Sequence, residues 1–400
     1  MNAPVRVVRP APWQRAAQKD APFAVFFEGA SQLLQLATAA AGLGVAVDGE
    51  AARVVGSEAQ LRRLQEELSS RDAALAQALA DALDPEPAWD LRTRALSMDG
   101  PHIMGILNLT EDSFSGDGVG HALGAAMRRA EALRAEGADL IDVGAETARA
   151  DRPVMDADQE AALSGQVVAA LVREGHLVSA DTYKPEVARA ALAAGAEVIN
   201  DISGLTLGTG AAQAAAQAGA GYVLNYSYSI PKRRPDRPPV YSDVVAETLG
   251  WMAERVAMLC GLGIQRGRIA IDPGIAFGKS HDEDLQVLRR AGEFTSLGVP
   301  LLLAHSRKNF IGSINGSQPA ERDPETHAAT VLAYAQGARI FRVHDAAGTR
   351  RALDVARAVL GGAPGDYAPD GSSWPWRAGA AGSHMTTASP DSQAPAGQRW

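Results

Sequence analysis

Polar and charged residues follow eight short apolar runs from residue 103 onward, at the points where strands would end. The runs are Ile103–Leu107, Leu140–Val143, Leu177–Ala180, Val198–Ile199, Tyr222–Leu224, Ile269–Ile271, Leu301–Ala304 and Ile340–Phe341. The residues that follow them include Asn108, Glu146, Arg149, Asp181, Asn200, Asp201, Asn225, Tyr226, Asp272, Ser306, Lys308, Arg342 and His344. A single Asp at a strand end is usually a helix cap. A polar group after every run instead indicates one shared site.

The chemistry of these residues separates into two sets. Asp181, Asn200 and Asp272 carry acceptor or amide groups, which suit a planar ring with adjacent N–H donors. Lys308, Arg342 and His344, together with Asn108, suit an anion, because Arg binds phosphate oxygens through two parallel hydrogen bonds. A site with both sets would hold a polar heterocycle at one end and a phosphorylated group at the other.

The elements that must position these residues are short strands alternating with alanine-rich amphipathic helices. The runs are mostly apolar, as in strands that are buried on both faces. Eight strand–helix units in about 260 residues predict a (β/α)₈ TIM barrel, an α/β fold whose active site lies at the carboxyl ends of the strands. A doubly wound open sheet is the alternative, but eight repeats at this spacing favour closure.

The chain divides into four predicted segments. Residues 1–20 contain proline and arginine and are expected to be a flexible arm, and residues 362–400 are a tail whose composition predicts disorder. Residues 21–95 predict a small N-terminal α/β domain, which lacks the polar groups of a catalytic site and is interpreted as a docking or structural domain. Residues 96–361 form the predicted barrel. The strands expected in the N-terminal domain are Ala24–Phe27, Val45–Val47 and Arg53–Val55. The expected helices are Ser31–Ala41, Ser57–Leu68 and Arg71–Leu83. Ser57 and Gln60 would form a capping box at the start of the second helix, and Asp84-Pro85 would end the third.

Composition excludes several classes of function. The formal net charge of -9 disfavours a nucleic-acid partner, which requires a basic face. The single cysteine, Cys260, allows no intrachain disulfide and suits a reducing cytoplasm. No signal peptide is expected. The most apolar stretch, Phe23–Val47, is interrupted by Glu28, Gln32 and Gln35, so no membrane span is expected either.

Six motifs, in order and one per strand, resemble those of the dihydropteroate synthase family over about Pro101–Leu360. They are Asn-Leu-Thr-Glu-Asp-Ser-Phe (108–114), Asp-Thr-Tyr-Lys-Pro-Glu-Val-Ala (181–188), Ile-Asn-Asp-Ile-Ser-Gly (199–204), Asp-Pro-Gly-Ile-Ala-Phe-Gly-Lys (272–279), Ser-Arg-Lys-Asn-Phe-Ile-Gly (306–312) and Arg-Val-His-Asp (342–345). The family joins 6-hydroxymethyl-dihydropterin diphosphate to para-aminobenzoate and releases diphosphate. The resemblance therefore implies a transferase of folate-type pterin biosynthesis.

The resemblance also implies roles for individual residues. The implied pterin contacts are Asp181, Asn200, Asp272, Phe277 and Lys308, with Lys308 on the carbonyl side of the ring. The implied diphosphate contacts are Asn108, Arg342 and His344, with Mg²⁺ bound at Asn108. The implied arylamine pocket contains Ala148, Arg149, Phe277 and Asn309. The implied catalytic set is Asn108, Arg149, Asp181 and Lys308, and a homodimer through barrel helices is also implied.

Most departures from the family pattern lie around the arylamine pocket and its loop, and the change after the fifth strand lies near the implied pterin. Ala148 and Ala150 stand where the family has Thr and Pro, Asn309 stands in place of Ser, and Asn225-Tyr226-Ser227 replaces Met-His-Met. Neutral drift would explain them.

A different second substrate would explain them too. An arylamine bearing a ribosyl phosphate, as in methanopterin-type cofactors, could place its phosphate near Arg149, His305 or Lys279, and para-aminobenzoate would then be used poorly. A non-catalytic pterin-binding subunit is the third interpretation.

Overall fold

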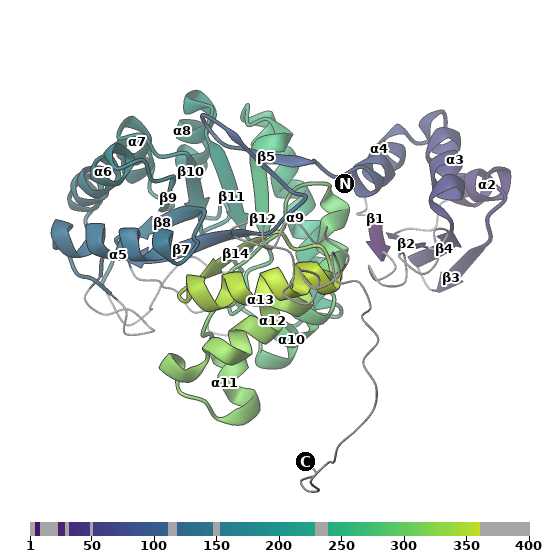
Figure 1. Ribbon diagram of the computed structural model, residues 1–400. Helices are drawn as coiled ribbons and strands as arrows, with labels where there is room; N and C mark the ends of the chain where they lie inside the picture. The colour runs from purple at the N-terminus through teal and green to yellow at the C-terminus, as the bar shows by residue number, and fades with distance from the viewer. Residues whose placement is uncertain are drawn as a thin grey trace, which may run out of the picture.

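The computed structural model describes residues 5–8, 23–28, 32–48, 51–110, 118–146, 153–228 and 239–360. These ranges contain an eight-stranded barrel and a small sheet with three helices, seen side by side in Figure 1. Within them, no helix is both long and apolar enough to cross a membrane. The predicted tail, 362–400, lies outside the described residues.

The barrel confirms the predicted (β/α)₈ fold. Its strands pair in parallel in the order β12-β11-β10-β9-β8-β7-β14-β13, and a bridge between Ile271 and Leu301 joins the two end strands. The strands are β7 (His102–Asn108), β8 (Leu140–Gly144), β9 (Val178–Asp181), β10 (Val198–Asp201), β11 (Gly221–Asn225), β12 (Ile269–Asp272), β13 (Leu302–Leu303) and β14 (Ile340–Val343). Each of the eight predicted runs is a strand, so the open sheet is excluded.

Helices alternate with these strands and cover the outside of the barrel (Figure 1). They are α5 (Leu123–Ala135), α6 (Ala157–Arg173), α7 (Pro185–Ala193), α8 (Gly210–Ala218), α9 (Val244–Gly261), α10 (His281–Arg289), α11 (Asn309–Asn315), α12 (Asp323–Ala335) and α13 (Ala346–Val359), with 3₁₀ segments η1 (Arg266–Arg268), η2 (Ala291–Leu297) and η3 (Pro319–Glu321). The main apolar core lies between the strands and this helical layer.

A second, smaller apolar cluster fills the part of the barrel lumen nearest the amino-terminal ends of the strands. It includes Met104, Leu140, Val198, Val223 and Ile340, each near the start of its strand. Side chains alternate between the two faces of a strand, so the residues two and four positions further along the same strands also face the lumen. This alternation brings the polar groups near the strand ends into one cavity above an apolar floor.

A hairpin of β5 (Ala88–Asp90) and β6 (Ala95–Ser97) closes the lumen at the amino-terminal ends of the barrel strands. Trp89 is fully buried in the inner cluster, and its Nε1 donates to the carbonyl of Arg268 at 3.0 Å. The hairpin therefore packs as part of the barrel. The N-terminal domain ends with α4 (Ala73–Leu83), before the predicted boundary at residue 95.

The N-terminal sheet has the order β1-β2-β4-β3, with every pair antiparallel. The elements of the N-terminal domain are β1 (Val5–Val8), β2 (Phe23–Glu28), α2 (Gln32–Ala40), β3 (Val45–Asp48), β4 (Ala51–Gly56), α3 (Glu58–Ser69) and α4. The three predicted strands and three predicted helices are confirmed, and Ser57 and Gln60 form the predicted capping box.

The prediction of a flexible arm over residues 1–20 is wrong for Val5–Val8. These residues pair with β2, and Val5 and Val7 are buried in the core of the domain. The strand is short and carries Arg6 among its valines, so the composition of the whole segment obscured it.

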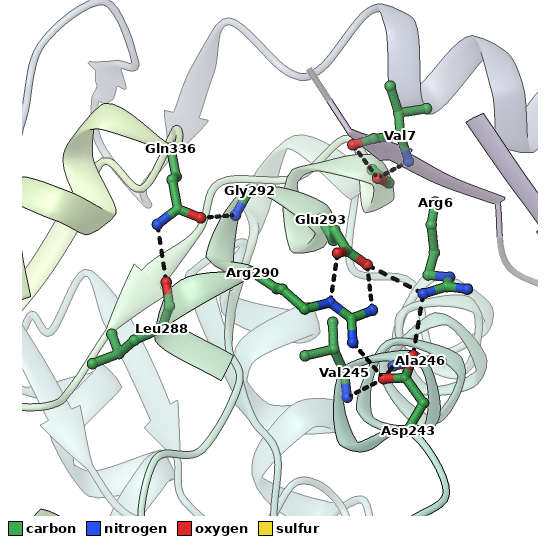
Figure 2. Close-up of polar contacts among 11 residues, drawn as sticks. Arg6, Val7, Asp243, Val245, Ala246, Leu288, Arg290, Gly292, Glu293 and Gln336 are labelled. Carbon is green, nitrogen blue, oxygen red and sulfur yellow. Dashed lines mark hydrogen bonds and ion pairs between the residues drawn. The ribbon is translucent and has the colours of Figure 1, made fainter. Parts of the chain in front are cut away.

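The N-terminal domain docks on the barrel through the free edge of β1 (Figure 2). The backbone N–H of Val7 donates to Ser296 Oγ at 2.7 Å. Arg6 lies 3.4 Å from Asp243 and 3.3 Å from Glu293, and Arg290 binds both of these carboxylates. An exposed edge strand would be open to pairing with other chains. The barrel covers this one and supplies a partner for Val7.

A second contact joins α4 and the residues after it to η1 and to Gly298, which follows η2. Asp81 pairs with Arg266 at 2.8 Å, and the N–H of Glu86 donates to the carbonyl of Gly298 at 2.8 Å. Gly298 has a φ of 68°, and a Cβ at this position would lie 2.5 Å from the carbonyl oxygen of Asp81. Only glycine allows this close approach of the two backbones.

Gly298→Ala should therefore destabilise the protein through the interdomain contact. We expect a loss of roughly 2–4 kcal/mol, because the left-handed backbone adds about 1–2 kcal/mol to the steric clash. Gly316→Ala is the matched control, since Gly316 has a φ of 80° with open space around it and should lose only the backbone contribution. Urea unfolding measures both variants, and equal losses would contradict the close contact.

Candidate active site

Arg342 is the centre of the polar group in the lumen. From β14, its Nε donates to Asp142 Oδ2 at 2.6 Å, and its Nη2 donates to Asp181 Oδ2 at 2.8 Å. Asn200 donates from Nδ2 to the same oxygen of Asp142 at 2.9 Å. Strands β8, β9, β10 and β14 thus contribute to one hydrogen-bonded network, in which a single cation is shared by two carboxylates.

Asp142 is the member of this network that sequence reasoning missed. It has no exposed surface and lies inside the apolar run Leu140–Val143 rather than after it. The alternation of side chains along a strand could have identified Asp142, because it is two residues after the lumen-facing Leu140. Its Oδ1 has no hydrogen-bond partner among the described residues.

The two predicted pterin acids have raised pKa values. Burial raises the pKa of Asp181 to about 7, against the opposing effect of Arg342. Burial also raises the pKa of Asp272, against the opposing charge of Lys308, and Asp272 Oδ1 accepts from the N–H of Gly274 at 2.9 Å. Asp181 can therefore change its protonation near neutral pH with small changes in its surroundings.

Lys308 follows β13 and extends over the loop after β12. Its Nζ donates to the carbonyl of Ile275 at 2.6 Å and lies 4.9 Å from the centre of the Phe277 ring. Burial lowers the pKa of Lys308 to about 8, while the charges of Asp272 and Asp284 oppose this shift. Lys308 and Phe277, both predicted to contact the pterin, thus lie together.

His344 and Asn108 lie on neighbouring strand ends, because β14 pairs with β7. The ring of His344 shares a hydrogen bond of 2.8 Å with Ser306 Oγ, and its carbonyl accepts from Arg129 at 2.7 Å. Asn108 is the half-buried last residue of β7. Two of the three predicted diphosphate contacts thus follow neighbouring strands, but Arg342, the third, is paired with the two acids.

Other candidates lie away from the lumen. Asp201 faces outward, where it accepts from Tyr222 Oη at 2.7 Å and from the N–H of Ser203. Asn309 is exposed, and its Oδ1 accepts from Arg322 at 3.0 Å. Ala148, Arg149 and Ala150 lie outside the described residues.

Two of the basic residues proposed to meet a ribosyl phosphate have other partners in the structure. His305 is fully buried and within 2.9 Å of Thr330 Oγ1, and burial lowers its pKa to about 4. Lys279 donates to the carbonyls of Pro273 and Gly274 and lies 3.7 Å from the ring centre of Tyr226.

A buried ion cluster beside the site was also not predicted. Lys184 Nζ donates to Glu146 at 2.6 Å, to Glu160 at 2.5 Å and to the carbonyl of Met155 at 2.7 Å. Tyr183 donates to the second oxygen of Glu146 at 2.8 Å. The cluster joins the described residues on the two sides of the segment 147–152.

The comparisons with known proteins agree with this geometry. The family described as pterin binding enzyme matches residues 104–344, more than half of the chain. Dihydropteroate synthase from Escherichia coli is 38% identical over 267 residues, which cover 66% of this chain and 94% of that protein.

Solved structures show the same relationship. Dihydropteroate synthase from Yersinia pestis with a sulfonamide drug has a TM-score of 0.65 at 33% identity and covers 68% of this chain and 98% of that one. The Xanthomonas albilineans enzyme with 4-aminobenzoic acid has a TM-score of 0.62 at 37% identity, with the same coverage of each chain.

A barrel with this lumen and these relatives defines a pterin-binding transferase. The chain belongs to the dihydropteroate synthase family.

Affinity for the ring should depend on pH through Asp181 and Lys308. The Asp181 carboxylate forms as pH rises through about 7 and then accepts a stronger hydrogen bond, whereas Lys308 loses its charge above about 8. We expect calorimetry with 6-hydroxymethyl-dihydropterin, which lacks phosphates, to give maximal affinity between about pH 7 and 8. Asp181→Asn should remove the rise in affinity below about pH 7, and Lys308→Met should remove the fall in affinity above about pH 8. Equal affinity at pH 6 and 7.5 would contradict these roles.

Proposed function

We propose that this chain condenses 6-hydroxymethyl-dihydropterin diphosphate with para-aminobenzoate and releases diphosphate. The observation that carries the proposal is the lumen network of Asp142, Asp181, Asn200 and Arg342, with Asp272 and Lys308 beside it. Acceptors on strands β9, β10 and β12 suit the N–H edge of a pterin. The Lys308 ammonium suits the ring carbonyl.

The residues would act by binding, orienting and balancing charge. The ring held at the acceptors places its methylene carbon toward β7 and β14, where Asn108 and His344 would contact the diphosphate. Breaking the carbon–oxygen bond puts negative charge on the departing diphosphate, and positive groups near it stabilise that charge. The ring electrons stabilise the electron-poor carbon that the arylamine attacks.

Arg342 has two uses in this scheme. In the described structure it is held by two acids, which fix the orientation of its guanidinium. When Asp181 bonds to the ring, the guanidinium is freer to turn toward the diphosphate. The pairing thus keeps the cation in place before substrate binds.

Two observations support para-aminobenzoate over an arylamine with a ribosyl phosphate. His305 is enclosed and of low basicity, and Lys279 is turned inward onto carbonyls. Neither offers a free positive charge to a phosphate. The structure of the X. albilineans relative, at 37% identity, is described with 4-aminobenzoic acid.

Steady-state kinetics with both arylamines tests the second substrate. We expect kcat/KM for para-aminobenzoate of about 10⁴ M⁻¹s⁻¹ or above, in the ordinary range for enzymes. The ribosyl-phosphate arylamine should be at least roughly tenfold poorer, because its phosphate would lose hydration without gaining a cation. The reverse ratio would favour the methanopterin-type reaction, and no release of diphosphate with either amine would favour the non-catalytic subunit.

We also propose that Mg²⁺ binds at Asn108 together with the diphosphate. Among the described residues, no cluster of three or more His, Cys, Asp or Glu could hold a metal with protein ligands alone. Mg²⁺ often takes only one or two protein ligands and completes its shell with water and substrate phosphates, so a single amide oxygen at the phosphate end fits this ion. Bound there, Mg²⁺ would neutralise charge on the departing diphosphate.

Turnover should therefore require Mg²⁺ and depend on Asn108. Asn108→Ala should raise the Mg²⁺ concentration for half-maximal turnover by roughly tenfold, since it removes one ligand of the shared site. Asn315→Ala, at an exposed position on α11, is the control. Full activity in excess chelator would overturn the metal assignment.

A homodimer through barrel helices is supported by exposed apolar side chains. Leu332 on α12 and Val355 and Val359 on α13 are largely exposed, and these two helices pack against each other. The mass in solution, determined by sedimentation, tests this proposal.

We place the enzyme in the cytoplasm on the evidence of its single cysteine.

A further inference from the structure

Asn225 is a polar residue of the lumen for which the reaction outlined above has no use. It ends β11, two residues after the lumen-facing Val223, and only 2% of its surface is exposed. It lies directly beside Asp272, its register partner on β12. An amide at this depth has its groups satisfied by the protein, by ordered water or by a ligand.

The orientation of this amide is fixed by its neighbours. Asn225 Nδ2 donates to the carbonyl of Ile202 at 3.2 Å and to the carbonyl of Tyr226 at 2.8 Å. Carbonyl oxygens accept only, so the NH₂ group must occupy this side and Oδ1 the other. No group in the described ranges donates to Oδ1, which leaves a rigidly held acceptor beside Asp272.

The order of the strands indicates which part of a pterin this acceptor would face. Around the barrel, Asp181, Asn200, Asn225 and Asp272 come from consecutive strands β9, β10, β11 and β12, and Lys308 follows β13. Along the edge of a 2-amino-4-oxo-dihydropterin, the groups run in the order N8–H, N1, 2-amino, N3–H and 4-oxo. If Lys308 is at the 4-oxo group and Asp181 at the far end, β11 faces the exocyclic 2-amino group.

We propose that Asn225 Oδ1 accepts a hydrogen bond from the exocyclic 2-amino group of the pterin and makes this residue a determinant of ring specificity. The proposal rests on the proposed function, since it requires a pterin in the lumen. The 2-amino group has two N–H bonds. Asp272 takes one, together with N3–H, and Asn225 takes the other.

Two rings that differ only in the amino group separate this contact from a structural role. The ligands are 6-hydroxymethyl-7,8-dihydropterin and its 2-desamino analogue, titrated by calorimetry into the full-length protein and the Asn225→Leu variant. We expect Asn225→Leu to weaken the 2-amino ring by roughly 3- to 10-fold, the range for one net hydrogen bond, and to leave the 2-desamino ring within about twofold. Asn225→Ala, which cannot overpack the site, should give the same pattern.

The outcomes distinguish this proposal from its premise. If the unmodified protein binds neither ring, the proposed function fails. If it binds the 2-amino ring and the variants lose equal affinity for both rings, Asn225 only ties the carbonyls of Ile202 and Tyr226, and the proposal is overturned. Unchanged affinity for the 2-amino ring in both variants, with unchanged melting temperature, also overturns it.

Discussion

The pairing of Arg342 with Asp142 and Asp181 is the interaction on which the rest of the lumen depends. Two carboxylates in a cavity with an apolar floor would be strongly destabilising without a cation, because charge is poorly solvated there. One guanidinium bonds to both through separate nitrogens. Its planar, rigid donors fix the relative positions of β8, β9 and β14 more firmly than a lysine could.

The same balance of charge explains why the pKa values of Asp181 and Lys308 lie close to neutrality. Burial raises the pKa of Asp181 and lowers that of Lys308, because it disfavours the charged form of each group. The charge of Arg342 opposes the first shift, and the charge of Asp272 opposes the second. Asp181 and Lys308 therefore lie where substrate binding can shift their protons.

Strand periodicity made the barrel predictable, and the same periodicity was not used far enough to find all of the site. The apolar runs predicted parallel strands buried on both faces, and their number and spacing favoured a closed barrel over an open sheet. Asp181, Asn200, Asp272 and Arg342 entered the candidate site because each follows a run. Asp142 was missed because it interrupts one. Partners such as Glu146 with Lys184 could not be predicted, because they are far apart in sequence and meet only through packing.

The N-terminal domain shows where local sequence signals end. Its turn and capping residues predicted most of its elements, since those signals act within a few residues. The strand Val5–Val8 exists through contacts that are remote in sequence, to β2 on one edge and to Ser296 on the other. Arg6 joins the network of Asp243, Arg290 and Glu293 only once both domains are folded.

The docking contact and the rim of the barrel share one short segment of chain. Asp243 is the N-cap of α9, and Tyr241, two residues before it, bonds to Tyr226 after β11. The domain therefore restrains the start of α9, and any motion of that segment must be compatible with the docked sheet.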